Sequence, residues 1–509
     1  MTTYRTRGLA IALTLAAATT ALTATATAAP AAQARSTGAG APAPDSLDWK
    51  PCAFDGAVSG QECASLPVPL DYAHPRGPGL TVAVSRLRGQ HPDKRRGALL
   101  VIPGGPGGSG LRQLAEQGPA LRTQTGGAYD VVSLDPRGVG ASTTASCGLS
   151  ADDRMLVNLR SWPGPGGDIS ENVARSRRVA EACERNGGAV LRSFTTRNEV
   201  RDIDRFRQAL GERRLSAYGV SYGTYVGAVY AQSYPQHTDR WVLDSNGDPD
   251  PRRVERGWLA NMAPAADIRF PDFAAWASDP ARESQGLRLA QRPSGVRPLF
   301  LALAAKLDVR PRKTTRDGVA LTGNHLRQAL QLALYSDSSF PMLARLVQQA
   351  QDPTATPVLP PPLAEPLSDQ DAAATVGVIC NDVSWPQHTP GTYERAVAAD
   401  RLRHPLTAGS PVNIVPCAFF KEGPAEKPVR ITGDGPSNIL MIQGLRDPAT
   451  PYFGALKMRR AWGDRARLVT VDHGGHGMYL DNGNACGDRA VTTFLTTGER
   501  PEKDTYCAG

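Results

Sequence analysis

The sequence feature that most constrains the fold is a serine enclosed by glycines, in the stretch AYGVSYGTYV at residues 217–226. Gly219, Ser221 and Gly223 fit the pattern G-x-S-x-G, between an apolar run and a helical stretch that extends to about residue 234. In that setting the pattern is typical of a strained turn from a strand into a helix, with the serine hydroxyl exposed at its tip. Glycines are needed on both sides because a side chain there would clash with neighbouring backbone. The stretch predicts a nucleophilic serine, and the alternative is a plain glycine-flanked turn.

Strands and helices alternate around this turn, which predicts an α/β fold with a parallel sheet. From about residue 251 to 411 amphipathic helical segments replace the strands, and strand character then returns. We therefore expect an α/β core in two parts, 45–250 and 412–509, interrupted by a helical cap at 251–411. The expected strands are residues 81–89, 97–110 with a glycine-rich end, 129–142 with a polar turn, 240–246, 437–447 and 466–477, and the expected helices outside the cap are 171–187, 196–210 and 453–462.

The N-terminus has the layout of a secretory signal peptide. Arg5 and Arg7 precede an uncharged Ala/Leu/Thr stretch that ends in small residues, so we expect a signal peptide at 1–28 and a leader or pro-segment at 29–44. A membrane anchor is the alternative, but the stretch is rich in threonine and alanine rather than leucine and isoleucine. We expect a secreted, extracellular protein without a stable membrane anchor.

Export would place the eight cysteines in an oxidising compartment, where an even number indicates disulfides. Eight cysteines allow 105 pairings, so the sequence leaves the connectivity open. The simplest pairing joins cysteines that follow one another in the chain, because each pair then closes a local loop. No C-x-x-C occurs, which argues against a zinc or redox site, and we expect no metal. The pairs would be Cys52–Cys63, Cys147–Cys183, Cys380–Cys417 and Cys486–Cys507.

The charge balance does not point to a nucleic-acid partner. Lysine and arginine number 57 against 49 aspartates and glutamates, a net charge of +8. The basic residues form no dense run and do not interleave with aromatic residues, so we interpret them as a solvated surface.

A serine nucleophile needs a base, and the base needs an acid that orients it. In the chain order Ser…Asp…His, the acid ends a strand beyond the cap and the histidine follows the last strand. Asp447 and His476 meet these conditions. Asp244 and Asp472 are rival acids and His473 is the rival base; His476 is preferred because its glycine neighbours permit an exposed loop. Asp447 also has a plainer interpretation, as a turn residue or a helix N-cap.

Acyl transfer also requires backbone N–H groups that stabilise the developing oxyanion. The N–H of Tyr222, directly after the serine, is one candidate. The glycine-rich stretch PGGPGGSG at 103–110 would supply the other, and we favour Gly105 because Pro106 has no N–H. A phosphate-binding loop is disfavoured because the stretch lacks the G-K-[ST] ending.

With these residues in place, the chain resembles the secreted bacterial tripeptidyl aminopeptidases, α/β-hydrolase serine peptidases related to proline iminopeptidase with a TAP-like C-terminal segment. The resemblance covers nearly everything after the leader. Two departures are Pro103, where proline iminopeptidases usually have histidine, and Val220, where these relatives often have glycine; the first leaves the second oxyanion donor open. The motifs that carry the resemblance are, in order, ECASLPVPLDYAHP, GGPGGSG, DPRGVGAS, GVSYGTYVG, VICNDVSWP, GLRDPATP and GGHG.

The resemblance implies an α/β-hydrolase fold with a helical cap, and cleavage of peptides near a free N-terminus through an acyl-enzyme. An exopeptidase has to recognise an ammonium group, and a carboxylate in the cap is the physical way to do so. Asp382 is the candidate, and its alternative is a helix-terminus or hinge residue. We expect peptide substrates, no cofactor and a monomer. A carboxylesterase or other acyl hydrolase on the same scaffold remains an alternative, as does a non-catalytic secreted binding protein.

Overall fold

The structure, a computed structural model, describes residues 47–387 and 389–509. These residues belong to one compact unit that spans Ala43–Gly509. The expected signal peptide (1–28) and leader (29–44) lie outside the described residues. Within the part of the chain that is described, no helix is long and apolar enough to span a bilayer.

The main sheet consists of strands from both ends of the chain. Its strands are Lys50–Pro51 (β1), Gln61–Pro69 (β2), Gly79–Leu87 (β3), Ala98–Ile102 (β4), Asp130–Leu134 (β5), Leu215–Val220 (β6), Thr238–Asp244 (β7), Ile439–Arg446 (β10), Ala466–Gly474 (β11) and Thr505–Cys507 (β12). They lie in the order β1-β2-β3-β5-β4-β6-β7-β10-β11-β12. The pairs from β1 to β5 are antiparallel, and all pairs from β5 to β12 are parallel.

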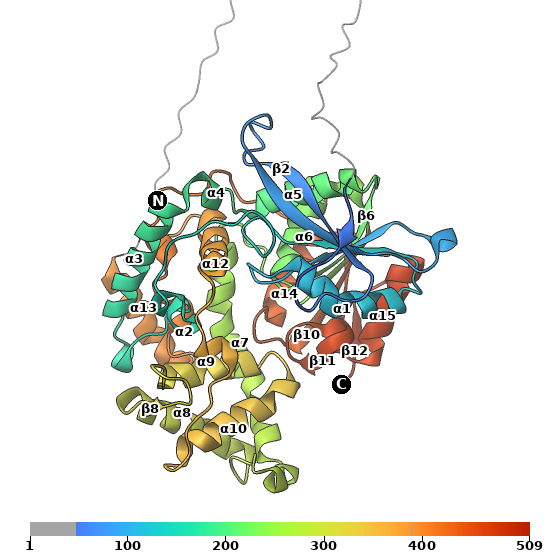
Figure 1. The fold of residues 1–509 in the computed structure, drawn as a ribbon. Coiled ribbons are helices and arrows are strands. Elements are labelled where there is room, and N and C mark those ends of the chain that lie inside the picture. The colour runs from blue at the N-terminus through green and yellow to red at the C-terminus, as the bar shows by residue number, and fades with distance from the viewer. Residues whose placement is uncertain (1–46, 388) are drawn as a thin grey trace, which may run out of the picture. The chain divides into compact units, whose positions relative to one another are not determined.

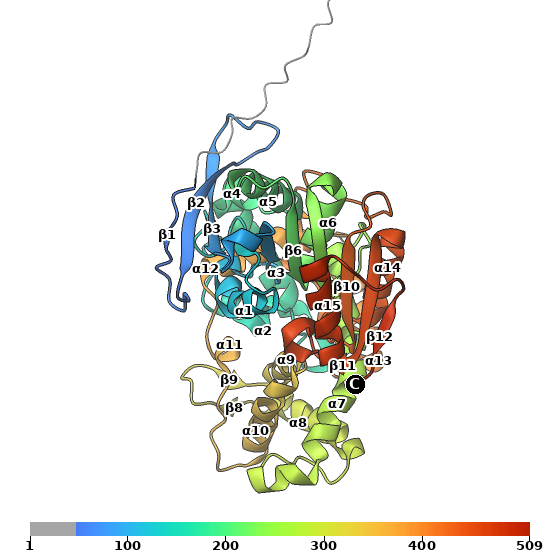
Figure 2. The same cartoon turned by 90° about the vertical axis from the view of Figure 1, so that its right-hand side faces the viewer.

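Helices cover both faces of this sheet (Figures 1 and 2). They are Gly110–Gln124 (α1), Leu156–Leu159 (α2), Ser170–Asn186 (α3), Gly188–Arg192 (α4), Thr196–Ala209 (α5), Tyr222–Ser233 (α6), Tyr452–Trp462 (α14) and Ala485–Thr497 (α15). Side chains of α1 and α15 pack on one face of the sheet, and side chains of α3, α5, α6 and α14 pack on the other. This strand order with two helical layers is the α/β-hydrolase fold.

The central strands are apolar along their whole length because both faces are covered. In β4, Leu99 and Val101 face the α1 and α15 side, whereas Leu100 and Ile102 face the α5 and α6 side. Successive side chains of a strand point to opposite faces, so a strand covered on both sides reads as a continuous apolar run. This explains why the apolar run from residue 98 predicts a buried strand.

A helical block interrupts the sheet between β7 and β10. It contains Val254–Ser278 (α7), Pro293–Val309 (α8), Gly323–Ala333 (α9), Phe340–Gln351 (α10), Pro361–Ala364 (α11), Asp369–Asn381 (α12) and Pro390–Arg403 (α13), with the two-residue strands Arg312–Lys313 (β8) and Ala320–Leu321 (β9). Helices α7 to α10 bury their apolar faces in a cluster of their own. In Figures 1 and 2 helices α8, α9 and α10 lie together, apart from the strands of the main sheet.

Helix α12 packs differently from α8, α9 and α10. Its Ala373 and Val376 belong to the apolar cluster of the main sheet. Figures 1 and 2 both draw α12 close to α3 and α4. The division into a core at 45–250 and 412–509 and a cap at 251–411 therefore describes the order of segments along the chain rather than their packing. It remains our proposal for the domain limits.

All eight cysteines form disulfides, which join the cysteines in the simplest pairing considered from the sequence. The third bond fastens the last turn of α12 to the segment that leads back to the sheet. The pairs are Cys52–Cys63, Cys147–Cys183, Cys380–Cys417 and Cys486–Cys507.

Candidate active site

Ser221 lies at the tip of the turn between β6 and α6. Its φ of 60° and ψ of −126° are an unusual conformation for a residue with a side chain. The turn is held by the Ser221 N–H, which donates to the Asp244 carbonyl at 3.1 Å, and by the Thr224 N–H, which donates to the Ser221 carbonyl at 2.9 Å. The G-x-S-x-G stretch therefore forms the strained strand–turn–helix geometry.

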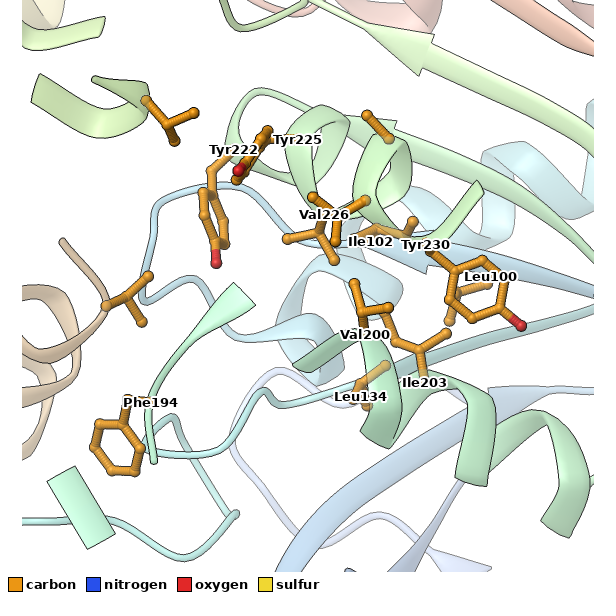
Figure 3. Packing of buried hydrophobic residues seen from close by; sticks show 14 of the residues in the cluster. Leu100, Ile102, Leu134, Phe194, Val200, Ile203, Tyr222, Tyr225, Val226 and Tyr230 are labelled. Carbon is orange, nitrogen blue, oxygen red and sulfur yellow. The ribbon is translucent and has the colours of Figure 1, made fainter. Parts of the chain in front are cut away.

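The flanking glycines are required by close backbone contacts. A Cβ atom on Gly219 would lie 2.6 Å from the Gly223 carbonyl oxygen, and one on Gly223 would lie 2.3 Å from the Ile102 carbonyl oxygen. Helix α6 is thus pressed directly against the end of β4. Figure 3 shows the packing below the turn, where Val226 and Tyr230 of α6 face Val200 and Ile203 of α5.

The glycine-rich loop after β4 contacts the serine. A Cβ atom on Gly104 would lie 3.2 Å from Ser221 Cβ and 3.7 Å from Ser221 Oγ. The loop closes through the Gly108 N–H, which donates to the Gly104 carbonyl at 3.2 Å, and the next residue, Gly105, has a φ of 125°. Thr375 of α12 lies on the other side of this loop, with its Oγ1 3.5 Å from the Pro106 carbonyl oxygen. The glycine in contact with the serine is Gly104, which the sequence analysis did not single out.

His476 and Asp447 meet at the carboxyl ends of neighbouring strands. Asp447 directly follows β10, and His476 follows β11 by two residues. His476 Nδ1 lies 3.0 Å from both carboxylate oxygens of Asp447. The backbone N–H groups of Ala449 and Thr450 each donate to Asp447 Oδ1 at 2.8 Å. Asp447 is almost fully buried, and this geometry orients the imidazole.

The serine and the histidine lie at the same edge of the sheet. Their strands β6 and β11 run in the same direction, so their carboxyl ends meet at one edge, where α/β sheets bind ligands. A Cβ atom on Gly477 would lie 3.8 Å from Val220 Cγ2, so the neighbour of the histidine touches the neighbour of the serine. All three residues of the Ser…Asp…His order thus follow strands whose carboxyl ends lie at this edge of the sheet.

The pKa shifts of His476 and Asp447 suit a base that is oriented by an acid. Burial lowers the pKa of His476, but the charge and hydrogen bond of Asp447 outweigh burial, and the pKa lies above its usual value. Burial raises the pKa of Asp447, but the His476 charge and the backbone donors outweigh it, and this pKa is lowered. Asp447 is therefore ionised when it faces the imidazole.

The rival acids and the rival base lie elsewhere. Asp244 ends β7 and accepts hydrogen bonds from the backbone N–H groups of Met478 and Tyr479, so it holds the loop after the histidine. Burial raises its pKa to about 6. Asp472 pairs with Arg446 on the partly exposed surface, and His473 Nδ1 lies 2.6 Å from the Gly474 carbonyl oxygen. None of these three hydrogen-bonds to His476 in the described structure.

Asp382 caps the end of α12 and belongs to a polar network below the serine. Thr196 donates to it twice: the backbone N–H donates to Oδ1 at 2.8 Å and the hydroxyl to Oδ2. The Thr196 hydroxyl also lies 2.7 Å from the Tyr222 hydroxyl, which donates to Glu199 Oε2 at 3.2 Å. The side chain of Tyr222, directly after the serine, thus connects to Asp382 through one threonine.

Glu199 is the residue of this network that the sequence did not reveal. It is 2% exposed, and its Oε1 has no hydrogen-bond partner. Burial raises its pKa to about 8, the Tyr222 hydrogen bond opposes that rise, and the charge of Asp382 adds to it. Glu199 occupies an ordinary inward position of an amphipathic helix, α5, and an acidic residue there gives no motif to recognise.

Tyr335, a residue of the helical block, contacts His476. Its ring packs edge-on against the His476 ring, with 5.0 Å between centroids, and its carbonyl accepts the His476 N–H at 2.8 Å. This contact was also absent from the sequence analysis, because Tyr335 follows α9 in an unremarkable loop. In the described residues, no three His, Cys, Asp or Glu side chains are grouped to hold a metal ion.

Comparison with known proteins shows that this chain is similar in sequence to peptidases and an esterase. A family model described as "TAP-like protein" matches residues 405–507. The tripeptidyl aminopeptidase of Streptomyces lividans is 32% identical over 478 residues, 91% of this chain and 86% of its own. The serine protease Hip1 of Mycobacterium tuberculosis is 27% identical over 485 residues, 91% of each chain. Carboxylesterase B of Mycobacterium tuberculosis is 31% identical over 484 residues, 90% of this chain and 89% of its own.

Proposed function

This chain belongs to the tripeptidyl aminopeptidase family of α/β-hydrolase serine peptidases, and from that premise we propose that it is a secreted monomeric exopeptidase. It releases short peptides, in the main tripeptides, from the free N-termini of peptide substrates. The observation that carries the proposal is the pair His476–Asp447, joined at 3.0 Å at the sheet edge where the strained Ser221 turn also lies.

In the proposed mechanism Ser221 Oγ attacks the scissile carbonyl carbon while His476 takes the hydroxyl proton. Asp447 holds the imidazole and stabilises its charged form. The backbone N–H groups of Tyr222 and Gly105 bind the oxyanion of the tetrahedral intermediate. The C–N bond then breaks, the leaving amine takes the proton from His476, and water hydrolyses the acyl-enzyme by the same steps. The chemistry uses side chains and backbone of this chain, without a metal or cofactor.

Asp382 is the proposed receptor for the substrate ammonium. Charge-assisted hydrogen bonds from an ammonium to a carboxylate are among the stronger polar contacts in proteins. Two features support this role. Asp382 lies at the end of α12, whose Thr375 lies against the glycine-rich loop, and it is linked to Tyr222 through Thr196. The residue as a whole is partly buried.

The length of α12 supports release of tripeptides. Thr375 and Asp382 are seven residues apart in this helix and its cap, about 10 Å at 1.5 Å per residue. Three residues of extended peptide span about 10 Å. An ammonium at Asp382 therefore suits a scissile carbonyl three residues away, beside the glycine-rich loop. A dipeptide would fall short, and a longer extended peptide would need to bend.

The four disulfides support secretion, since such bonds persist in oxidising compartments. The proposal extends to the N-terminal residues 1–28 as the signal that directs export.

The experiment that tests the function uses a panel of tripeptidyl p-nitroanilides that differ in the third residue, each with a free and with an acetylated N-terminus. We expect hydrolysis of the free forms, with kcat/KM reduced by at least about 100-fold on acetylation, because acetylation removes the charge-assisted hydrogen bond between the ammonium and Asp382. Ser221→Ala is expected to be inactive and folded. In Asp382→Asn the preference for the free form is expected to shrink, while Asp371→Asn, a change near the exposed start of α12, is the matched control.

Equal hydrolysis of free and acetylated substrates would contradict an exopeptidase and favour an endopeptidase. A carboxylesterase is the second candidate function, because a relative with that name is 31% identical. Hydrolysis of p-nitrophenyl esters with no tripeptidyl anilide cleaved would establish it. If a fluorophosphonate probe fails to label Ser221 in the folded protein, a non-catalytic binding role is the better interpretation.

A further inference from the structure

Asp382, the proposed receptor for the substrate ammonium, lines a small cavity beside helix α6. The cavity has a volume of about 40 Å³. Its wall consists of the first turn of α5, the end of α12, Tyr225 and Val229 of α6, and residues of the segment 425–429. The ammonium of a peptide and the side chain of its first residue are bonded to the same carbon atom. An ammonium that binds Asp382 in this cavity therefore brings that side chain into it.

The wall of the cavity offers a ligand one carboxylate and mainly apolar surface. Its other polar side chains are engaged with the protein: Asn198 Nδ2 and Asn381 Nδ2 donate to backbone carbonyls of the segment 191–194, at 3.0 and 2.8 Å, and Arg197 pairs with Glu426 at 3.0 Å. A carboxylate beside apolar surface suits a positive charge next to an apolar side chain, as in the first residue of a peptide with a free N-terminus. The apolar part of the wall is formed by Tyr225, Val229, Ala425, Pro428 and Val429.

Helix α6 sets the distance between this cavity and the nucleophile. Ser221 directly precedes the helix, and Tyr225 and Val229 follow it by four and eight residues, on one face. At 1.5 Å per residue these two side chains lie about 6 and 12 Å further along the helix axis. Three residues of extended peptide span about 10 Å. The cavity therefore lies at the distance of the first residue of a tripeptide, in agreement with the spacing along α12.

A contact also connects the wall of the cavity to the oxyanion site. Thr196 lines the cavity, donates to Asp382, and has its hydroxyl 2.7 Å from the hydroxyl of Tyr222. Tyr222 directly follows Ser221, and its backbone N–H is a proposed oxyanion donor. The cavity and the reacting groups are thus joined by side chains in direct contact.

The volume of the cavity limits the side chain that it accepts. A cavity needs about 10–15 Å³ to hold one water molecule, so 40 Å³ corresponds to about three such groups. The single methyl group of alanine and the three carbons of a valine side chain fit this space. A phenylalanine ring does not fit without displacing the wall, and Val229, which is almost fully buried, cannot swing out into solvent.

Resting on the proposed function, we propose that this cavity binds the side chain of the first substrate residue and selects small apolar residues there. Val229 is the specificity-determining residue, because its side chain limits the depth of the cavity along α6. The substrates are therefore peptides whose free N-terminus carries alanine or valine rather than a large or aromatic residue.

The test varies the first residue of the best tripeptidyl p-nitroanilide of the panel through Gly, Ala, Val, Leu and Phe, each with a free N-terminus. In wild type we expect kcat/KM to rise from Gly to Val, by up to about fourfold for each carbon that becomes buried. From Val to Phe we expect a fall of at least about 10-fold, because overfilling a packed cavity forces its wall to move.

Val229→Ala enlarges the cavity, so we expect the ratio of kcat/KM for Leu over Val at the first position to rise by about 10-fold. Val226→Ala is the matched control, since it removes the same atoms from the same helix on the side that faces α5, and it is expected to keep this ratio within twofold. Val429→Ala enlarges the cavity from the partly exposed segment 425–429 and is expected to raise the ratio without disturbing the packing of α6.

A wild-type enzyme that is indifferent to the first residue or prefers Phe there would overturn this inference. So would a Leu/Val ratio that neither Val229→Ala nor Val429→Ala changes. In these cases selective hydrolysis of the free over the acetylated tripeptides still supports the proposed function. If free and acetylated tripeptides are cleaved equally, or neither is cleaved, the proposed function itself fails, and this inference fails with it.

Discussion

At the scale of single residues, the site depends on which carboxylate faces the histidine. Three aspartates meet the simple requirement of lying at or near the end of a strand: Asp244, Asp447 and Asp472. They differ in their partners. Asp447 orients the imidazole, Asp244 binds the backbone of the loop that follows it, and Asp472 pairs with Arg446.

The three aspartates predict a graded series of variants. Asp447→Asn is expected to lower kcat by about 10³- to 10⁴-fold with the fold intact, because the imidazole loses its orientation and its charge stabilisation. Asp244→Asn keeps one acceptor oxygen for the loop, so we expect its kcat to fall by less than about 100-fold. Asp472→Asn is the control and remains near wild type. Steady-state kinetics with the free tripeptidyl anilide measure all three, and a larger loss in Asp244→Asn than in Asp447→Asn would reverse the assignment of the acid.

Glu199 predicts a pH dependence of stability. Its pKa is raised to about 8 in the folded protein, from 4.5. A carboxyl group with a raised folded pKa stabilises the fold fully below its unfolded pKa, and this contribution is lost as pH rises towards the folded value. The free energy of unfolding is therefore expected to fall between about pH 5 and pH 8. Glu199→Gln does not titrate and is expected to flatten this decline.

Urea unfolding at pH 5 and pH 8 measures the effect. The exposed Glu171 of α3 provides the control, since Glu171→Gln is expected to keep the wild-type pH dependence. An equal decline in Glu199→Gln and wild type would show that Glu199 is ionised in the folded protein.

At the scale of elements, the turn from β6 into α6 and the helix α12 place the reacting groups. The turn exposes the serine only because α6 begins directly against β4, a contact that Gly223 permits. Helix α12 packs its alanines and valines into the sheet's own cluster, and Cys380–Cys417 fastens its last turn. Thr375 in the middle of the helix and Asp382 at its end therefore keep a fixed separation between the glycine-rich loop and the proposed ammonium site.

Gly223→Ala tests the turn. Its Cβ would lie 2.3 Å from the Ile102 carbonyl oxygen, so α6 has to shift away from β4. We expect a loss of about 1–3 kcal/mol in the free energy of unfolding. We also expect a fall of about 100-fold or more in kcat, since small displacements of reacting groups are costly. In Gly391→Ala, a helical position in α13 with a Cβ contact at 3.6 Å, stability stays within about 1 kcal/mol and kcat is unchanged. A wild-type kcat in Gly223→Ala would contradict the geometric role of the turn.

At the scale of the whole molecule, one sheet joins strands from both ends of the chain. Asp447 and His476 follow β10 and β11, and β10 pairs with β7 although about 190 residues separate these two strands in the chain. Each of the four disulfides closes a local loop of 11 to 37 residues. They therefore stabilise individual regions and do not connect β7 to β10.

Disulfide formation is expected to be necessary for the folded enzyme. Each bond contributes about 2–4 kcal/mol, and four together are comparable to the total stability of a typical domain, about 5–15 kcal/mol. Protein produced in a reducing cytoplasm is therefore expected to be unfolded or inactive, and protein exported to an oxidising compartment to be active. Circular dichroism and hydrolysis of the anilide measure this. The double variant Cys52→Ser/Cys63→Ser, which loses the shortest loop, is expected to remain folded; full activity of the reduced protein would contradict the prediction.

Local patterns predicted most of the elements and failed at identifiable places. The expected strands at 81–89, 240–246 and 437–447 correspond to β3, β7 and β10 within two residues at most ends. Within the helical cap predicted at 251–411, no clear amphipathic pattern marks α7, because Pro264 and Pro271 lie inside it, or α12, because it is buried around most of its circumference. The strand β12 is three residues long and gives too short a pattern.

The sequence by itself determined the chemistry available to this protein: a glycine-flanked serine at a strand–helix turn, an aspartate and a histidine after later strands, and the chain order of the family. Local constraints are sufficient there, because glycine conformations and strand ends are properties of short segments. Only the tertiary structure decided that Asp447 rather than Asp244 or Asp472 faces His476, that Gly104 touches Ser221, and that Tyr335 packs against the His476 ring. Those contacts join residues far apart in the chain, and the burial and charges that select among them exist only after the sheet has closed around the helical block.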